Sequence, residues 1–434
     1  MPTSKSATPY SLLSIAGALE AAGYSVTFID FCLENISPLS ASKMLQKISP
    51  RCIILSSTLG TLKEDTRMLR GLSKKTHKAC VVFPPYDPKK ILKREPLLDS
   101  IILGYDYENV SIELVKTLID NNDVSKLKGI AYKIGEEIIQ NQLLPPTDIS
   151  DLPLPTYNLA KMELYPNFVV TQTSRGCPYG CIFCPVAGKK WVSRTPTQVV
   201  DEMELMEKKY KKRVIRFIDP EFTMRYERTQ EICEEYLQRR LKIKWTCDSR
   251  VDLVDKSLLK AMKKANCIKI LYGAESGSNE ILREIKKRTN TEEIFNAIKW
   301  TKEVGILDNT TFMFGSPSDN YETFNATMKF IKKLKPTISS GGFLKPYPNT
   351  EVYKIGLRKG LIENTDVFTY NITDYPPMKT QYLTSDEVYQ LSLILAKECN
   401  SLNYSFKYLM YRLREEGLKS LPKLLLKGLK VVKT

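Results

Sequence analysis

Apolar and polar positions follow two different periods along this chain. In residues 10–122, short runs of consecutive apolar residues alternate with segments of helical period. The runs that we expect to form strands are 25–30, 51–57, 79–83 and 99–104, and the expected helices are 10–23, 61–75 and 108–120. Continuous apolar strands that alternate with helices predict a parallel, doubly wound sheet, so residues 1–125 are expected to form a Rossmann-like domain.

Residues 126–160 are predicted to connect the N-terminal domain to the barrel. The stretch 129–141 is expected to be a β-hairpin that turns at Gly135, and the proline-rich stretch 143–159 is expected to be a linker.

The alternation of strands and helices resumes after this linker. The expected strands are 168–173, 214–219, 243–248, 268–276, 310–316 and 341–348. One of the helices between them, residues 199–210, carries Val199, Met203, Met206 and Tyr210 at helical spacing and so has one apolar face. Six β/α units predict a partial TIM-type barrel over residues 161–355, with its chemistry at the carboxyl ends of the strands. Residues 356–434 are expected to form a helical C-terminal region.

Composition indicates a folded cytoplasmic protein. Of the 434 residues 42% are hydrophobic and 26% charged, and no apolar run is long enough to span a membrane. The first nine residues lack the apolar core of a secretory signal, so the ten cysteines are expected to be reduced thiols or metal ligands. The one histidine, His77, argues against histidine-based metal sites and triads; its lysine-rich surroundings predict a solvated surface residue.

The net charge of +16 is unevenly spread. Residues 407–434 hold eight basic and two acidic side chains, and their leucines recur at spacings of three and four with lysines on another face. Such a basic amphipathic helix is suited to peripheral contact with the inner face of a membrane, whereas the alternative is a helix packed on the barrel with solvated lysines. Nucleic acid is not an expected partner, because the sequence carries no stacked-aromatic RNA-binding signature.

Three cysteines lie close together in RGCPYGCIFCP, at Cys177, Cys181 and Cys184. No other cysteine or histidine lies within thirty residues, so a closed four-ligand zinc site is incomplete locally. Three thiolates on a four-iron cluster would leave one iron open to a reacting ligand. The alternatives are three unrelated core cysteines or a zinc site completed from afar. The other seven cysteines are expected to be small buried hydrophobes.

This CxxxCxxC motif resembles that of the radical S-adenosylmethionine (radical SAM) superfamily. The resemblance implies a 4Fe-4S cluster whose open iron binds S-adenosylmethionine, which one electron cleaves to a 5′-deoxyadenosyl radical. It also implies a reductant protein such as a ferredoxin or flavodoxin.

The resemblance also assigns cofactor-binding positions. Phe183 matches the residue that packs against adenine, and either Asp219 or Glu221 matches the acidic group that meets the methionine ammonium. Arg250 matches a partner for the methionine carboxylate. Glu275 and Ser276 match positions near the ribose, and Gly315 matches the fifth-strand glycine near adenine. The resemblance names no residue as catalytic.

Segments from residue 10 to 355 are similar to the branch of this superfamily that carries an N-terminal cobalamin-binding domain. The match weakens in that domain: its opening strand is missing from residues 1–9, VVFPPYDP replaces the usual glycine pair, and no DxHxxG motif surrounds His77. Two interpretations stay open, a domain that binds cobalamin and a relic that shapes the substrate pocket.

The leading hypothesis is a radical SAM enzyme that functionalises an unactivated C–H bond by methyl transfer or C–C bond formation, on a lipid or other bulky apolar substrate. A second hypothesis is a methylthiotransferase acting on tRNA or protein, with a second cluster on Cys32, Cys52 and Cys80. A third is a non-catalytic metal-binding scaffold. Substrate, product and oligomeric state do not follow from the sequence.

Overall fold

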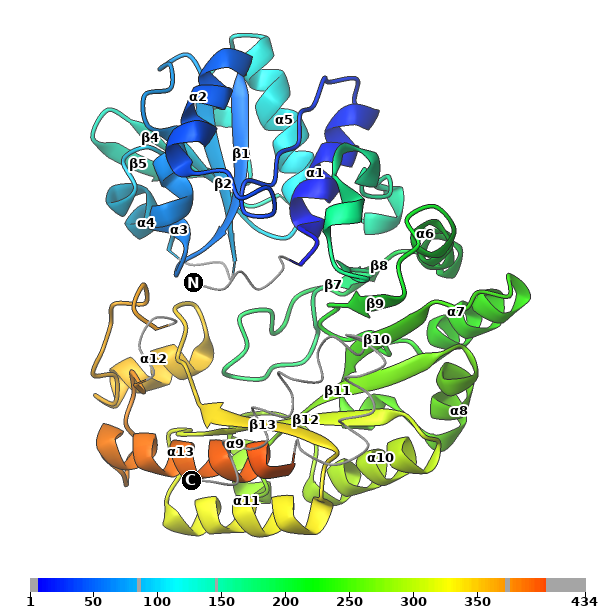
Figure 1. The fold of residues 1–434 in the computed structure, drawn as a ribbon. Helices are drawn as coiled ribbons and strands as arrows, with labels where there is room; N and C mark the ends of the chain where they lie inside the picture. The colour runs from blue at the N-terminus through cyan, green and yellow to red at the C-terminus, as the bar shows by residue number, and fades with distance from the viewer. Residues whose placement is uncertain (1–6, 84–86, 145–146, 371–374, 403–434) are drawn as a thin grey trace. The chain divides into compact units, whose positions relative to one another are not determined.

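The structure, a computed structural model, describes residues 7–83, 87–144, 147–370 and 375–402. The chain divides into two compact units (Figure 1). The described residues of Met1–Pro166 and Asp366–Thr373 make up unit 1, and those of Asn167–Thr365 and Asp374–Thr434 make up unit 2. The predicted basic helix in residues 407–434, the prolines and tyrosine at 84–86, and residues 1–6 lie outside the described residues.

Unit 1 contains one five-stranded sheet in the order β1-β2-β3-β4-β5. Its strands are β1 (Cys52–Thr58), β2 (His77–Phe83), β3 (Ser100–Ile102), β4 (Ile130–Ile134) and β5 (Glu137–Gln140). The first three strands are parallel, whereas β4 and β5 form an antiparallel hairpin. The expected hairpin in residues 129–141 is thus confirmed.

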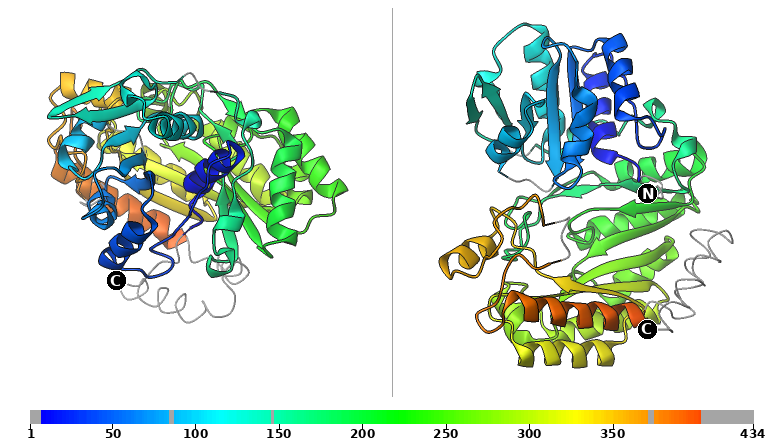
Figure 2. Two further views of the ribbon diagram at one scale, coloured as in Figure 1. Left: turned by 90° about the horizontal axis from the view of Figure 1, so that it is seen from above. Right: turned by 60° about the vertical axis from the view of Figure 1, so that its left-hand side comes forward.

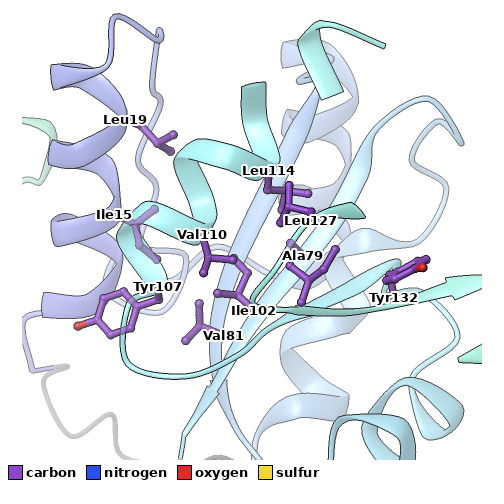
Figure 3. Packing of buried hydrophobic residues seen from close by; sticks show 11 residues of the cluster. Ile15, Leu19, Ala79, Val81, Ile102, Tyr107, Val110, Leu114, Leu127 and Tyr132 are labelled. Atoms are coloured by element: carbon purple, nitrogen blue, oxygen red, sulfur yellow. The ribbon is translucent and has the colours of Figure 1, made fainter. Parts of the chain in front are cut away.

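The core of unit 1 lies between this sheet and two of its helices. The helices of the unit are α1 (Tyr10–Ala21), α2 (Pro38–Ile48), α3 (Leu62–Asp65), α4 (Pro88–Arg94) and α5 (Tyr107–Ile119). Ile15 and Leu19 of α1 meet Val110 and Leu114 of α5 above Val81 of β2 (Figure 3). Burial of such side chains stabilises the unit by about 1.5–3 kcal/mol each.

Two expectations for unit 1 are wrong. Residues 25–30 form no strand, and only α3 and a 3-10 turn at Thr66–Leu69 form in the expected helix 61–75. In the doubly wound order 2-1-3-4-5, the second strand pairs only with the first. Among the described residues no strand precedes residue 25, so 25–30 have no ladder partner. The helical geometry ends at Leu69, because Arg70 is already extended with a ψ of 136°, and Gly71 follows with a left-handed φ of 73°.

His77 is also placed differently from the prediction. It is the first residue of β2, half-buried, and its Nε2 lies 2.8 Å from the hydroxyl of Ser100. Burial lowers the pKa of this imidazole. The lysine-rich sequence around His77 therefore does not mark a solvated loop, because the strand begins inside it.

The other seven cysteines divide into two groups. Five are buried as expected: Cys80, Cys233, Cys247, Cys267 and Cys399. Cys32 is exposed and Cys52 is only half-buried, contrary to the prediction. Cys32 lies in a turn after the segment that does not form a strand, and Cys52 begins the edge strand β1.

Unit 2 contains a six-stranded, wholly parallel sheet in the order β13-β12-β11-β10-β9-β6. Its strands are β6 (Phe168–Thr171), β9 (Val214–Phe217), β10 (Lys244–Ser249), β11 (Cys267–Glu275), β12 (Leu307–Phe314) and β13 (Ile338–Phe343). Each strand pairs with the preceding strand of the series, which confirms the predicted partial barrel. The last strand ends before the expected residue 348, because prolines at 346 and 348 cannot donate to a ladder.

Helices cover one face of this sheet (Figures 1 and 2). The helices of unit 2 are α6 (Pro196–Lys208), α7 (Tyr226–Gln238), α8 (Lys256–Lys264), α9 (Asn279–Glu284), α10 (Thr291–Glu303), α11 (Tyr321–Leu334), α12 (Glu351–Arg358) and α13 (Ser385–Leu402), and α12 lies apart from the layer that covers the sheet. A capping box between Thr195 and Gln198 begins α6. Within the described ranges, no helix has the length and apolar character needed to cross a membrane.

Candidate active site

The three motif cysteines lie on one loop that leaves the sheet at the carboxyl end of β6. Two short antiparallel strands, β7 (Ser174–Arg175) and β8 (Val192–Ser193), pair and close the base of this loop. Inside it, the amide of Lys189 donates to the carbonyl of Cys177 over 2.9 Å. The loop is therefore held in shape by its own backbone at the strand ends, where the sequence predicts the chemistry.

The thiols of this loop lie close enough to influence one another's ionisation. Cys177 and Cys181 are buried, and Cys184 is half-buried. Burial raises the pKa of Cys177 to about 11, and the charges of Glu221, Cys184 and Cys181 also act to raise it. Three thiolates side by side are thus disfavoured unless a bound cationic group compensates their charge.

A single metal ion and a cluster need different arrangements of the ligands around them. A zinc site gathers its ligands around one point, and among the described residues no three His, Cys, Asp or Glu side chains converge in this way on a single ion. In a four-iron cluster each thiolate bonds to its own iron, so the sulfurs surround a larger body. The donor set, three thiols without a nearby fourth, therefore fits a cluster with one open iron.

Asp219 follows β9 and is enclosed by the protein. Its carboxylate accepts hydrogen bonds from the amide and hydroxyl of Thr173, over 2.6 and 2.5 Å, and from the hydroxyl of Ser174 over 2.8 Å. Burial raises the pKa of Asp219, whereas the charge of Arg228 acts to lower it. Asp219 thus fixes the chain where the cysteine loop begins.

Glu221 lies two residues further on and has a different environment. Its Oε2 accepts a hydrogen bond from the amide of Arg250 over 2.8 Å, and its charge acts on the ionisation of both Cys177 and Cys181. Burial raises the pKa of Glu221 to about 8, against the opposing effects of Lys287 and Arg250. Of the two acidic residues, Glu221 is the one that lies in the electrostatic field of the cysteine thiols.

Aromatic packing supports the turn that carries both carboxylates. The rings of Phe217 and Phe222 stack with centroids 4.9 Å apart, and Phe222 lies 5.2 Å from the ring of Trp245. The indole of Trp245 donates to the carbonyl of Ala265 over 2.6 Å. These large buried rings fix the chain on both sides of residues 218–221.

Arg250 follows β10 and is almost completely buried. It forms a bidentate pair with Asp252, over 2.8 and 3.0 Å, and its Nη2 donates to the carbonyl of Lys287 over 2.6 Å. Its guanidinium lies 3.7 Å above the ring centroid of Tyr179, and its Nη1 lies 3.9 Å from the sulfur of Cys181. The protein itself therefore engages every nitrogen of this side chain.

A second buried ion pair lies at the end of β11. The Nζ of Lys287 is 3.2 Å from Oε1 of Glu275, and the two side chains are only 8% and 13% exposed. The register of β11 shifts between Gly273 and Glu275, and Glu275 has a φ of 67°. A Cβ at Gly273 would lie 2.3 Å from Oε1 of Glu275 and 2.9 Å from Nζ of Lys287. The ion pair thus lies directly against the backbone of the strand.

The remaining predicted residues lie at the ends of β11 and β12 or in the loop. The hydroxyl of Ser276 lies 3.2 Å from that of Thr327. Gly315 has a φ of 94°, and its amide donates to Asp319 over 2.9 Å. Phe183 is half-buried in the cysteine loop. Their roles toward a nucleotide stay predictions.

Two residues at this site were not predicted from the sequence. Lys287 belongs to the run IKKR, whose charges suggest a solvated surface, and nothing in the sequence distinguishes it from Lys286. Tyr179 lies inside the motif between two cysteines, a position that could have drawn notice. Its stacking on Arg250, however, depends on a residue 71 positions away.

Comparison with known proteins agrees with this arrangement. Residues 171–331 match the sequence model of the radical SAM superfamily. The chain is 27% identical over 380 residues to an uncharacterized methyltransferase of Pyrococcus horikoshii, covering 85% of this chain and 82% of that protein. It is 26% identical over 367 residues to the anaerobic magnesium-protoporphyrin IX monomethyl ester cyclase of Rubrivivax gelatinosus, covering 78% of this chain and 64% of the cyclase.

Solved structures show the same fold. The cobalamin-dependent S-adenosylmethionine radical enzyme OxsB, with aqua-cobalamin and S-adenosylmethionine bound, gives a TM-score of 0.77 at 20% identity, covering 94% of this chain and 66% of that one. The radical S-adenosylmethionine methyltransferase TsrM of Kitasatospora setae, with cobalamin and a [4Fe-4S] cluster bound, gives 0.72 at 16% identity, covering 90% and 83%.

Proposed function

Because residues 171–331 of this chain form a radical SAM domain, we propose that its cysteine loop holds a 4Fe-4S cluster for reductive cleavage of S-adenosylmethionine. The observation that carries the proposal is the set of three mutually interacting thiols at the strand ends without a nearby fourth ligand. Cys177, Cys181 and Cys184 would be the cluster ligands. When bound, the cluster supplies the electron that generates a 5′-deoxyadenosyl radical; the protein binds, orients and shields.

Within this proposal, Glu221 is the acidic residue that meets the ammonium group of S-adenosylmethionine. Both oxygens of Asp219 already accept hydrogen bonds from Thr173 and Ser174, whereas Glu221 lies in the field of the cysteine thiols. Pairing of Arg250 with the methionine carboxylate would require release of its contact with Asp252 or Lys287. The nucleoside would be contacted as the resemblance implies, with adenine near Phe183 and Gly315 and the ribose near Glu275 and Ser276.

Unit 1 is proposed to bind cobalamin at the carboxyl ends of β1 to β3, where doubly wound sheets hold their ligands. The hydroxyls of Ser57, Thr58 and Thr61 gather at the carboxyl end of β1, where those of Thr58 and Thr61 are 3.1 Å apart, and offer hydrogen-bonding groups at this edge. The cobalamin bound in OxsB and TsrM supports the same assignment. The reaction would then be methyl transfer or C–C bond formation at an unactivated carbon.

The substrate class and partners are further parts of the proposal. A lipid or other bulky apolar substrate rests on the basic sequence of residues 407–434, which would also give peripheral contact with the inner face of a membrane. A ferredoxin or flavodoxin would supply the electron. Nucleic acid is not proposed as a partner.

The methylthiotransferase hypothesis keeps one supporting observation, 26% identity over 372 residues to a putative methylthiotransferase of Methanocaldococcus jannaschii. Its second cluster would need Cys32, Cys52 and Cys80 to come together. In the structure Cys32 is exposed in a turn, Cys52 begins β1, and Cys80 is buried inside β2. This arrangement favours a single cluster.

Anaerobic reconstitution with iron and sulfide tests the proposal. We expect about four irons per chain, 5′-deoxyadenosine after addition of S-adenosylmethionine and dithionite, and a corrinoid spectrum after incubation with cobalamin. Eight irons would support the methylthiotransferase. A chain that yields no 5′-deoxyadenosine despite a full cluster would be a scaffold.

A further inference from the structure

We infer that Arg250 and Tyr179 are positioning residues that hold Cys181 in place before any cluster binds, and that Arg250 is not a ligand of the methionine carboxylate. The inference rests on the proposed function, since Cys181 is one of the three proposed cluster ligands. It gives a role to Tyr179, which was not predicted, and gives Arg250 a different role from the one that the resemblance implies.

The guanidinium of Arg250 joins the end of β10 to a second segment of the chain. Its Nε and Nη2 pair with the carboxylate of Asp252 over 2.8 and 3.0 Å, which fixes the plane of the group. Its Nη2 also donates to the carbonyl of Lys287 over 2.6 Å. On either side of Lys287, Lys286 and Arg288 both have a left-handed φ, of 53° and 55°. Arg250 thus ties the strand end to a turn whose conformation is uncommon for residues other than glycine.

The cysteine loop packs against this fixed group. The guanidinium carbon of Arg250 lies 3.7 Å from the ring centroid of Tyr179, well within the range of a cation–π contact. The carbonyl of Tyr179 accepts from the amide of Gly188 over 2.8 Å, so the stacked residue takes part in the backbone hydrogen bonds that hold the loop in shape. The Nη1 of Arg250 lies 3.9 Å from the sulfur of Cys181. A planar guanidinium can stack on a ring and donate from its edge at the same time, whereas an ammonium group cannot.

Cys181 also contacts the turn that Arg250 holds. The amide of Ile182 donates to the carbonyl of Ile285 over 3.1 Å, and the sulfur of Cys181 lies 3.8 Å from the carbonyl of Lys286. The cysteine loop, the turn at residues 285–288 and the end of β10 therefore meet at one buried side chain, Arg250. Loss of its contact with the loop should loosen the loop around Cys181.

A carboxylate ligand could engage Arg250 only by breaking contacts within the protein. Arg250 is 1% exposed, and its Nε and Nη2 already donate to Asp252 and Lys287. Such an exchange would leave a buried acceptor without its donor, which is costly. The side chain is therefore suited to ordering the chain around it and not to binding an incoming anion.

The experiment is hydrogen exchange of the full-length protein without iron, followed by mass spectrometry of peptides that cover residues 177–190. For Tyr179→Leu we expect exchange in these peptides to be at least tenfold faster than in wild type, and Tyr179→Phe, which keeps the stacked ring, should restore the wild-type rate. Tyr210→Leu is the matched control, because Tyr210 follows α6, outside the cysteine loop, with the Nζ of Lys209 5.4 Å from its ring centroid. Unchanged exchange in Tyr179→Leu, no recovery in Tyr179→Phe, or an equal increase in Tyr210→Leu would overturn the inference.

Exchange in residues 199–208 of α6 reports on misfolding: each variant should match wild type there, and faster exchange in α6 as well would contradict a role confined to the loop. Arg250→Lys keeps the charge but not the stacking plane, so it should accelerate exchange in residues 177–190 at least as much as Tyr179→Leu does. The double variant should exchange no faster than Arg250→Lys alone, because the two residues share one contact.

Binding of S-adenosylmethionine separates the two roles of Arg250. After anaerobic reconstitution, Arg250→Lys at full iron content should bind S-adenosylmethionine with wild-type affinity in equilibrium dialysis. Tenfold weaker binding at full iron content would overturn the inference and assign Arg250 to the carboxylate. Failure of the wild-type protein to assemble a cluster would instead contradict the proposed function, since the exchange experiment needs no cluster.

Discussion

The carbonyl oxygen of Lys190 lies 2.1 Å from the position that a Cβ would occupy on Gly176. Gly176 also has a φ of 76°, so the residue before the first cysteine lies in a left-handed conformation against the segment of the loop that leads into β8. No side chain fits there unless the base of the loop opens.

Gly176→Ala should therefore impair cluster assembly. We expect the variant to retain less than half of the wild-type iron per chain after anaerobic reconstitution, because the loop cannot close. Gly180→Ala is the matched control in the same motif: no atom lies within 4 Å of a Cβ at that position, and its φ is not positive. Equal iron content in the two variants would contradict this view of the loop.

The two acidic residues after β9 should respond differently to loss of charge. Asp219→Asn disturbs three hydrogen bonds and the field of Arg228, and should lower the free energy of unfolding by about 1–3 kcal/mol in urea denaturation. Glu221→Gln should change stability less and weaken binding of S-adenosylmethionine, measured by anaerobic equilibrium dialysis. The reverse pattern would assign the ammonium site to Asp219.

The position of His77 predicts the spectrum of a bound corrinoid. His77 begins β2, whereas the proposed cobalamin site lies at the carboxyl end of that strand, after Phe83. As the chain has no other histidine, no protein imidazole is available at that edge. The optical spectrum of the cobalamin-loaded protein should thus be the same in wild type and His77→Gln. A spectral change in the variant would show that the imidazole binds cobalt.

The free energy of unfolding should depend on pH through Asp319, whose carboxylate accepts a hydrogen bond from the amide of Gly315. Burial raises the pKa of Asp319 from 3.8 to about 6. The folded state therefore holds this proton more tightly than the unfolded state, so the contribution of Asp319 to stability is greatest below pH 4 and is lost as pH rises through 6. Between pH 5 and 7 wild type should lose about 1 kcal/mol relative to Asp319→Asn. Parallel pH dependences in urea denaturation would contradict this.

The parallel sheet of unit 2 and the cysteine loop were predictable because their signals are local. Buried strands have continuous apolar runs, and the cysteines of the motif are neighbours in sequence. The failures concern pairing at a distance. Residues 25–30 have the composition of a strand but no ladder partner, and the start of β2 at His77, two residues before the predicted strand 79–83, is recognisable only from its pairing with Cys52 of β1.

The same reasoning applies to the site. Asp219 and Glu221 follow the same strand and are equivalent in the sequence. Thr173 and Ser174, however, donate hydrogen bonds only to the carboxylate of Asp219. Lys287 and Lys286 are adjacent and chemically identical, yet only Lys287 is buried beside Glu275. Tertiary packing makes both distinctions, and no periodicity in the sequence encodes them.

Because Gly273 has no side chain, the ion pair between Lys287 and Glu275 can lie against the backbone of β11. The φ of Gly273 is not positive, so alanine suits the backbone, and the added methyl group would act as a wedge between a carboxylate and an ammonium group. One carbon atom at this position would thus displace the ion pair while every formal charge stayed in place. The electronic properties of the site could in this way be adjusted by steric means alone.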